Sequence, residues 1–244
     1  MNPLGNIKIY GESLIGEGTY NDVNIYGTAT GDGKIICSKL KVLGEADFEK
    51  ALTVDYAKIL GTVTLQEEVS INRSMIMGTL ESKKLFKFDE IKILGSVKIH
   101  ETMKGNKIIL KGAVEGKGEV EAERVEGFGM LDLDGLLNCE ILDLQLAHSK
   151  SFVKEIGGKS IRISDVRKNN SLLALTLMPF NNNVHFRSEL IEGDDIDLRF
   201  SEVKLIRGHN VTIGKGCRID RVEYTGSLNV LDNGVVKEDV KYEQ

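Results

Sequence analysis

The chain has 244 residues, of which 41% are hydrophobic and 28% are charged, and this composition excludes an intrinsically disordered chain. Its net charge of −5 argues against a general nucleic-acid-binding protein, because that function usually accompanies a basic domain. The sequence shows neither a signal-peptide pattern nor an apolar run long enough to cross a bilayer, so we expect a cytoplasmic protein. Its three widely spaced cysteines fit a reducing compartment.

A strict repeat occupies residues 1–144. Apolar phrases such as KVLG and KILG each end in a glycine. These glycines recur at a constant interval of about 17 residues, at Gly27, Gly44, Gly61, Gly78, Gly95, Gly112 and Gly129. An earlier glycine, Gly11, stands one place closer to Gly27 than this interval. A period held this closely indicates a solenoid in which each repeat is one coil, and residues 1–144 then hold about eight coils.

The apolar positions inside each repeat form three pairs. They stand at the second and fourth, the eighth and tenth, and the thirteenth and fifteenth places after the glycine, and Leu52 and Val54 are one such pair. A spacing of two residues is the strand period, in which alternate side chains share one face. The repeat therefore predicts an all-β fold, a parallel β-helix whose triangular coils of about 17 residues contain three short strands each. Cys37 and Cys139 fall in the same inward column, which predicts buried cysteines that behave as small core residues.

Residues 145–244 predict a less regular continuation of the β-helix. The phrases IDL, VTI and LNV begin at residues 196, 211 and 228, which are intervals close to the main repeat. Residues 165–187 break the pattern and predict an irregular insertion with an apolar centre. This centre either covers an open edge of the β-helix or contacts a membrane or partner. Its candidate residues are Leu172, Leu173, Leu175, Leu177, Met178 and Phe180.

Motifs for chemistry are scarce. The sequence contains no nucleotide-binding loop, no zinc-ligand spacing and no nucleophile motif, so we predict no enzyme activity and assign no catalytic, cofactor-binding or metal-binding residue. Asp132 and Asp134 share the outward face of a predicted strand, where a solvated acidic face is a better interpretation than a cation or sugar site. The segment VTIGKGCRI resembles one turn of a hexapeptide acyltransferase, and this enzyme class is the less favoured alternative.

One outward face of the predicted coils carries a basic stripe. It follows the strand just before each repeat glycine. Such a face can dock an anionic membrane surface or an acidic partner, or it can serve only to keep the surface soluble. The candidate contact residues are Lys39, Lys41, Lys58, Arg73 and Lys92.

The coil sequences carry a resemblance to a known family. The stretches GEGTYNDVNIYGTATGDGKIICSKLKVLG, IKILGSVKI and IRGHNVTIGKGCRIDRVEYTGSLNV resemble the bactofilins, the polymer-forming cytoskeletal proteins of bacteria, in particular longer bactofilin-like proteins of Firmicutes. The likeness extends over residues 5–144 and 188–230. It implies a right-handed β-helix that assembles without a nucleotide into filaments or scaffolds used in cell shape, envelope organisation or motility.

The resemblance also implies the partners. Self-association comes first, a second bactofilin-like protein is a further candidate, and peripheral membrane contact is compatible with it, whereas nucleic acid is not expected. A β-helix ends in an unpaired strand layer, so the terminal coils are the expected polymerisation ends. At one end they comprise Leu4, Ile7, Ile9 and Leu14, and at the other Leu228 and Val230.

Overall fold

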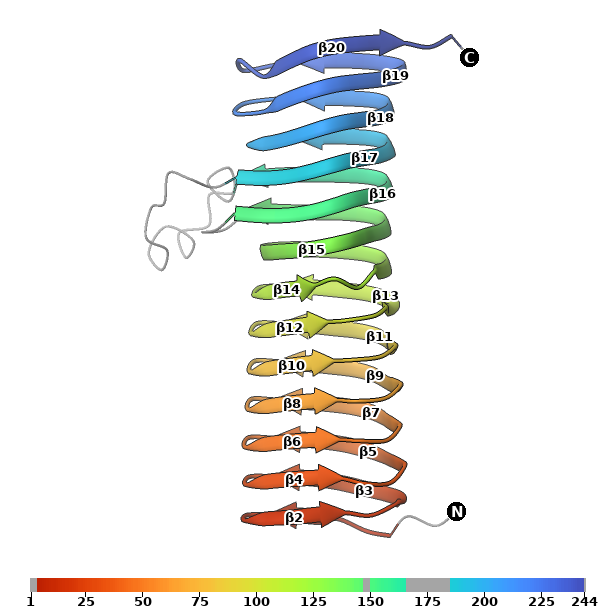
Figure 1. Cartoon of the computed structure of the whole chain (residues 1–244), viewed down its shortest axis with the longest axis vertical. Coiled ribbons are helices and arrows are strands. Elements are labelled where there is room, and N and C mark those ends of the chain that lie inside the picture. Colours follow the sequence, from red (N-terminus) through yellow and green to blue (C-terminus); the bar gives the residue numbers. More distant parts are fainter. Residues whose placement is uncertain (1–3, 147–149, 166–184, 244) are drawn as a thin grey trace. The chain divides into compact units, whose positions relative to one another are not determined.

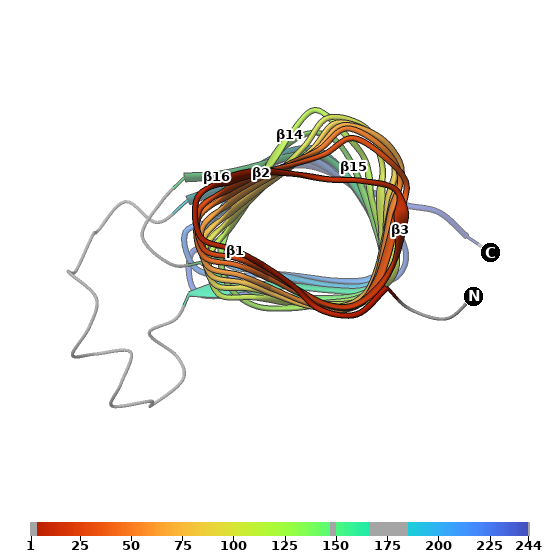
Figure 2. The ribbon, with the colours of Figure 1, turned by 90° about the horizontal axis from the view of Figure 1, so that it is seen from below.

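The computed structural model describes residues 4–146, 150–165 and 185–243, which form a β-solenoid of about 12 turns. The chain divides into two compact units, residues 1–121 and residues 122–244. In both units the strands of successive coils pair in parallel, which confirms the predicted parallel β-helix. The near strands β2, β4 and β6 run from left to right as the chain rises (Figure 1), and the view along the coils agrees (Figure 2), so the coils are right-handed.

The first unit alternates short and long strands. Each regular coil has one strand of four residues and one of eight, and Ile35 pairs with Leu52, which takes the same place in the next coil. The first coil is one residue shorter, since Ile7 pairs with Val23. The strands are β1 (Ile7–Ile9), β2 (Glu12–Ile15), β3 (Gly18–Ile25), β4 (Thr28–Gly31), β5 (Ile35–Val42), β6 (Glu45–Phe48), β7 (Leu52–Ile59), β8 (Thr62–Leu65), β9 (Val69–Ile76), β10 (Thr79–Ser82), β11 (Phe86–Ile93), β12 (Ser96–Ile99), β13 (Met103–Leu110) and β14 (Ala113–Gly116).

The long strands merge two of the three predicted strands. In β5 the inward residues are Ile35, Cys37, Leu40 and Val42, so the two predicted inward pairs are both present. Between the pairs stand two successive outward residues, and the pairing with the next coil runs from Ile35 to Cys37 and resumes at Lys39. The pairing is thus interrupted for a single residue, Ser38, where the inward alternation changes. Each coil therefore keeps three inward walls on two strands.

The repeat glycines are explained by close approach between coils. A Cβ built on Gly61 would overlap the carbonyl oxygen of Gly44 one coil below, and the same clash recurs at each glycine from Gly27 to Gly112. Gly11 belongs to the first coil, and its Cβ position is open. Backbone crowding rather than a left-handed conformation thus requires glycine at this corner.

The second unit has coils of unequal length. Ile161 pairs with Ile196, which pairs with Val211, which pairs with Leu228. These pairings confirm that the phrases at 196, 211 and 228 are successive passes of one wall. The strands are β15 (Val120–Leu146), which begins at the end of the first unit, β16 (Lys150–Asp165), β17 (His185–Leu198), β18 (Ser201–Ile213), β19 (Arg218–Val230) and β20 (Val235–Lys241).

Both ends of the segment 165–187, predicted as an irregular insertion, are strand. Asp165 is the last residue of β16, and β17 already begins at His185. Phe186 is fully buried and pairs with Ser151 and Ser201, so this part of the expected insertion is regular strand. The sequence-based bounds were too wide because polar and asparagine-rich residues near the ends obscured the alternation. The remainder, with the six apolar candidates Leu172–Phe180, lies outside the described residues.

Candidate functional site

The first coil forms an open end of the first unit. In the described part of the chain, β1 pairs with β3 and β2 with β4, so their other edges carry no strand. Ile9 is buried and Ile7 is partly exposed, and both occupy inward columns, one coil below Ile25 and Val23 respectively. Leu4 is 70% exposed. Of the four residues predicted for this end, Ile7 and Ile9 therefore lie in inward columns.

Leu14 differs from the other residues proposed for this end. It pairs with Thr30, whose column faces outward, and its side chain is 68% exposed. Ser13 and Ile15 take the inward columns instead, one coil below Ala29 and Gly31. Side chains alternate along a strand, so Leu14, which lies between the inward Ser13 and Ile15, faces the outer surface of the coil. It is therefore not part of the inward surface at this end.

The last coils form the open end of the second unit. Leu228 and Val230 continue the inward columns of Val211 and Ile213, as predicted for a terminal coil. Among the described strands β20 has only β19 as a partner, and it covers the first half of β19, so Val230 remains 47% exposed.

This end also carries an inward-column carboxylate that the sequence analysis missed. Asp239 pairs with Val222, a fully buried residue, and so occupies an inward column at the outermost layer. A charge at such a position disfavours a further strand layer, because stacking would remove it from water. The signal in the sequence was the register of VVKEDVK against RIDRVEY, which places Asp239 opposite Val222.

The predicted basic stripe consists of two columns on one outward face of the first unit. Lys39 and Arg73 belong to a column that Tyr56 and Glu90 interrupt. Lys41, Lys58 and Lys92 belong to a second column two residues further along the strand, where Lys8 also stands and where Asn24 and Met75 interrupt. The ammonium of Lys41 lies 6.0 Å from the centre of the Tyr26 ring. The face is thus predominantly but not continuously basic.

An apolar ladder that sequence reasoning did not identify lies beside this face. The residue before each repeat glycine points outward, so one large apolar side chain per coil stands at the same corner. We call this set the corner ladder, and it comprises Tyr10, Tyr26, Leu43, Leu60, Met77 and Leu94. Each is between 38% and 72% exposed, and the Tyr10 and Tyr26 rings stack with centroids 4.9 Å apart. The phrase KILG indicated this ladder in the sequence. Its isoleucine and leucine are adjacent and cannot both face inward, so the leucine before the glycine must face outward.

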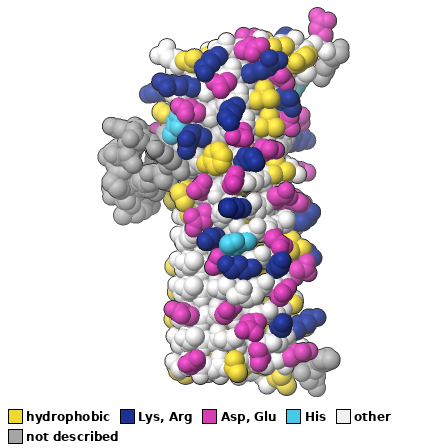
Figure 3. Space-filling view, viewed as in Figure 1, with side chains coloured by type: hydrophobic (Ala, Val, Ile, Leu, Met, Phe, Trp, Pro, Cys, Tyr) yellow, Lys and Arg dark blue, Asp and Glu magenta, His cyan; other side chains and the backbone are white. Residues whose placement is uncertain are grey.

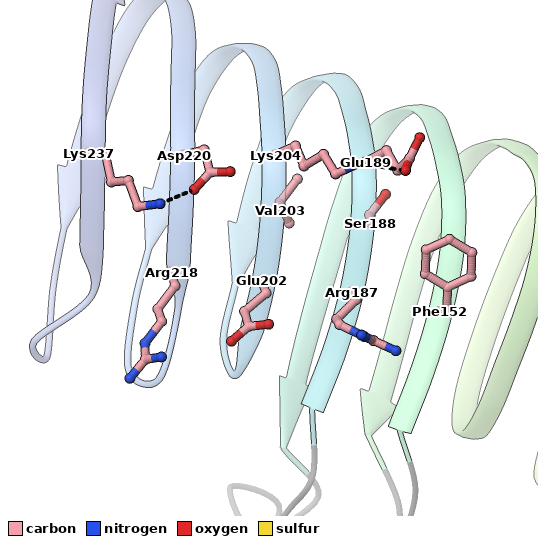
Figure 4. Close-up of a pocket in the computed structure, with 10 residues that line it drawn as sticks. All are labelled: Phe152, Arg187, Ser188, Glu189, Glu202, Val203, Lys204, Arg218, Asp220 and Lys237. Atoms are coloured by element: carbon pink, nitrogen blue, oxygen red, sulfur yellow. Dashed lines mark hydrogen bonds and ion pairs between the residues drawn. The ribbon is translucent and has the colours of Figure 1, made fainter.

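The second unit has an open groove of about 640 Å³ on its outward surface. One row along it contains Phe152, Arg187, Glu202 and Arg218, which successive coils place side by side (Figure 4). A second row contains two ion pairs, Lys204–Glu189 and Lys237–Asp220, each 2.7 Å long. The two arginines flank a carboxylate, so a ligand in this groove would meet both signs of charge.

Another shallow groove is floored by glycine. Gly158, Gly193 and Gly208 pair in successive coils, and no side chain covers the backbone at these three positions. The groove that results has a volume of about 840 Å³. The acidic side chains of Glu192, Asp194 and Asp195 border it. They are partly paired, since Asn210 donates to Asp195 at 3.0 Å and Arg207 contacts Glu192 at 2.9 Å.

On the face that Figure 3 shows, charges of both signs are interspersed rather than gathered by sign. His100 lies 2.7 Å from Glu81, which also accepts a hydrogen bond from Lys83 at 2.5 Å. The hydrogen bonds from Lys83 and His100 lower the pKa of the Glu81 carboxyl to about 2. Asp132 is exposed on the outward face of β15, as predicted, with the buried Leu131 and Leu133 on either side.

The three cysteines are buried, which confirms the prediction for Cys37 and Cys139. Burial, together with the nearby Asp55 and Asp22, raises the pKa of the Cys37 thiol to about 12, and burial alone raises that of Cys139 to about 12. Their thiolate forms are therefore scarce near neutral pH. In residues 4–146, 150–165 and 185–243 there is no group of three or more histidine, cysteine or acidic side chains placed to hold a metal ion. The same residues include no helix that is long and apolar enough to span a membrane.

Two proteins of Bacillus subtilis (strain 168) are similar to part of the chain. The uncharacterized protein YhbE is 35% identical over 94 residues, which are 38% of this chain and 38% of YhbE. The uncharacterized protein YhbF is 33% identical over 112 residues, which are 44% of this chain and 42% of YhbF. The matched part therefore spans about two fifths of each relative. No family model and no solved structure matches the chain.

Proposed function

We propose that this chain is a non-enzymatic cytoplasmic scaffold protein whose β-coils associate end to end into filaments, with roles in cell shape, envelope organisation or motility. The observation that carries the proposal is that, among the strands that the structure describes, β1 and β2 in the first unit and β20 in the second each have a partner on one edge only. The resemblance of the coil sequences to bactofilins supports it.

A strand with one free edge presents unpaired N–H and C=O groups, which a coil of another chain can satisfy at the ordinary interstrand distance of about 4.8 Å. At the first coil the inward Ile7 remains partly exposed, whereas Val23, the residue next in its column, is buried. A further coil placed there would extend the core with no change in the fold. No nucleotide is needed, because the interface is the same parallel ladder that joins coils within each unit.

The experiment compares variants at the two ends with an outward control. We expect Ile7→Asp and Val230→Asp to reduce the sedimentable, filamentous fraction of purified full-length protein, because each places a carboxylate in an inward column. Lys34→Asp changes the charge at an exposed outward position and should leave the sedimentable fraction unchanged. Circular dichroism verifies that each variant retains its strands. If the wild-type protein stays monodisperse over a wide range of salt and concentration, the proposal is wrong.

A further inference from the structure

We infer that the corner ladder of the first unit is an interface with a second copy of this chain, arranged side by side with its coil axis parallel. This lateral contact goes beyond the end-to-end assembly proposed above and does not depend on it. The interface uses Tyr10, Tyr26, Leu43, Leu60, Met77 and Leu94, together with the rows of side chains on either side.

The ladder is an unusually continuous apolar feature on an outward surface. Every coil from Tyr10 to Leu94 contributes one large apolar side chain, and backbone hydrogen bonds hold each coil to the one below, as from the N–H of Leu60 to the carbonyl of Val42 at 2.8 Å. Solitary exposed apolar residues are normal, but a contiguous row indicates a contact surface. Six rungs at the interstrand spacing extend over roughly 24 Å.

The spacing of the ladder favours another stack of β-coils as its occupant. One rung stands in each coil, so the repeat along the axis is about 4.8 Å. A partner helix presents a side chain per turn about every 5.4 Å, and an extended strand presents one on the same face about every 6.7 Å, so both lose register along six rungs. A second copy of this unit has the same rise and keeps register throughout.

The charges beside the ladder favour the parallel orientation. On one side of the rungs stands the column with Lys8, Lys41, Lys58 and Lys92. On the other side, directly after the repeat glycine, stands the column Glu12, Thr28, Glu45, Thr62, Thr79 and Ser96. The ladder is thus bordered by lysines on one flank and by carboxylates and hydroxyls on the other.

A two-fold axis parallel to the coils brings unlike flanks together. Each lysine flank then faces the partner's acidic and hydroxyl flank at the same level, so Lys41 meets Glu45 of the second copy and Lys8 meets Glu12. A two-fold axis across the coils would instead place lysine against lysine, with Lys41 facing Lys58. Like charges in close opposition oppose association, so the parallel arrangement is selected.

These flanking charges are available for such a contact. In the described part of the chain, Lys8, Glu12 and Glu45 form no ion pair, and all three are exposed. By contrast, Lys84 and Lys104 pair with acids one coil away, Glu101 and Glu121. Lys8, Glu12 and Glu45 are thus available to pair with another molecule, while Lys41 is half-buried with its ammonium 6.0 Å from the centre of the Tyr26 ring.

Charge reversal tests the orientation. In full-length protein carrying Ile7→Asp and Val230→Asp to suppress end-to-end assembly, we expect sedimentation velocity to show a dimer. Lys41→Glu should weaken this dimer about tenfold, because it converts two symmetry-related attractions into repulsions. The double variant Lys41→Glu/Glu45→Lys should restore it. A tighter dimer with Lys41→Glu alone would mean that the copies are antiparallel, and would overturn the inference.

Cross-linking tests the same geometry independently, since the native cysteines are buried. Leu94→Cys, near one end of the ladder, should form a disulfide-linked dimer on mild oxidation, because equal rungs face each other in the parallel pair. Lys117→Cys is the control at an exposed position away from the ladder and should not cross-link. Absence of the Leu94→Cys dimer overturns the inference whether or not filaments form.

A membrane is the occupant that competes with the second copy. If the wild-type protein cosediments with vesicles of anionic phospholipid, and Leu60→Glu abolishes this binding while the protein remains monomeric without lipid, the ladder is a membrane contact and the inference is wrong. We expect instead that Leu60→Glu abolishes the dimer and that vesicle binding is absent in both proteins.

Discussion

The two units build the same kind of coil but differ in how tightly a glycine corner constrains it. In the first unit each coil from Gly27 to Gly112 passes through the same corner, where a Cβ would overlap the glycine carbonyl one coil below. In the second unit coil lengths vary and the corresponding contact loosens along the stack, since a Cβ would lie 2.5 Å from the carbonyl oxygen below at Gly193 but 3.1 Å from it at Gly208. Ion pairs cross between coils in both units, and in the second Arg207 contacts both Glu192 and Glu223 at 2.9 Å. A close corner repeated in coil after coil enforces a constant period, whereas charged side chains on outward faces tolerate coils of unequal length.

The largest effect should come from filling the corner. We expect Gly61→Ala to lower the free energy of unfolding by about 3 kcal/mol or more, because its Cβ would overlap a backbone carbonyl that cannot move without disturbing the neighbouring coil. Gly11→Ala, in the same column of the first coil, has open space and should change stability little. Urea unfolding of both variants measures the difference. Equal stabilities would contradict the corner as the source of the period.

Assembly at the end of the second unit should increase when its inward-column carboxylate is removed. We expect Asp239→Val in the second unit to promote assembly, lowering the protein concentration needed for sedimentable polymer about tenfold, because burying a carboxylate without a partner is unfavourable. Glu238→Val, one residue earlier and outward, is the matched control, although it also loses a 2.9 Å contact with Arg221. Unchanged assembly with Asp239→Val would mean that the second unit's end takes no part.

A smaller, pH-dependent effect should come from Glu81 in the first unit. Its pKa is lowered to about 2, first by the hydrogen bond from Lys83 and then by that from His100. Because the pKa of Glu81 is lower in the folded protein than its ordinary value of 4.5, the ionised carboxylate stabilises the folded state at pH values above 4.5. This contribution is lost as the pH falls through about 2. Lys83→Met should therefore raise the pKa of Glu81, as read from NMR titration of its carboxyl carbon. Lys84→Met, which removes a partner of Glu101 instead, should leave that pKa in place.

The smallest effect should follow from removing a charge in the second unit. We expect Arg207→Met to reduce stability slightly at low salt, and the difference to vanish near 1 M salt, where the screening length is about 3 Å. Lys215→Met, at an exposed position, should change nothing at either salt concentration. A loss as large as that of Gly61→Ala would remove the contrast between the two units.

The fold was largely predictable because the inward columns dominate the sequence. Period and pairing followed from Gly27 to Gly112, and the first coil was correctly expected to be one residue shorter. The spacing of three between Cys37 and Leu40 showed the bend, but not that β5 continues through it as a single strand, because pairing with the next coil resumes at once after the bend.

The candidate surfaces were less predictable for a physical reason. Outward positions have no packing constraint, so their meaning depends on which residues become neighbours across coils. Leu14 was assigned to the terminal surface although alternation turns it outward, and the corner ladder was overlooked because its residues adjoin inward ones. Asp239 becomes informative only once its pairing with Val222 is known.

Electron microscopy of the purified full-length protein tests the central claim most directly. We expect filaments without added nucleotide, with a meridional reflection at about 4.8 Å in fibre diffraction from the continued stacking of coils. Single particles of one chain, or of a lateral pair, at every salt and protein concentration would contradict end-to-end assembly.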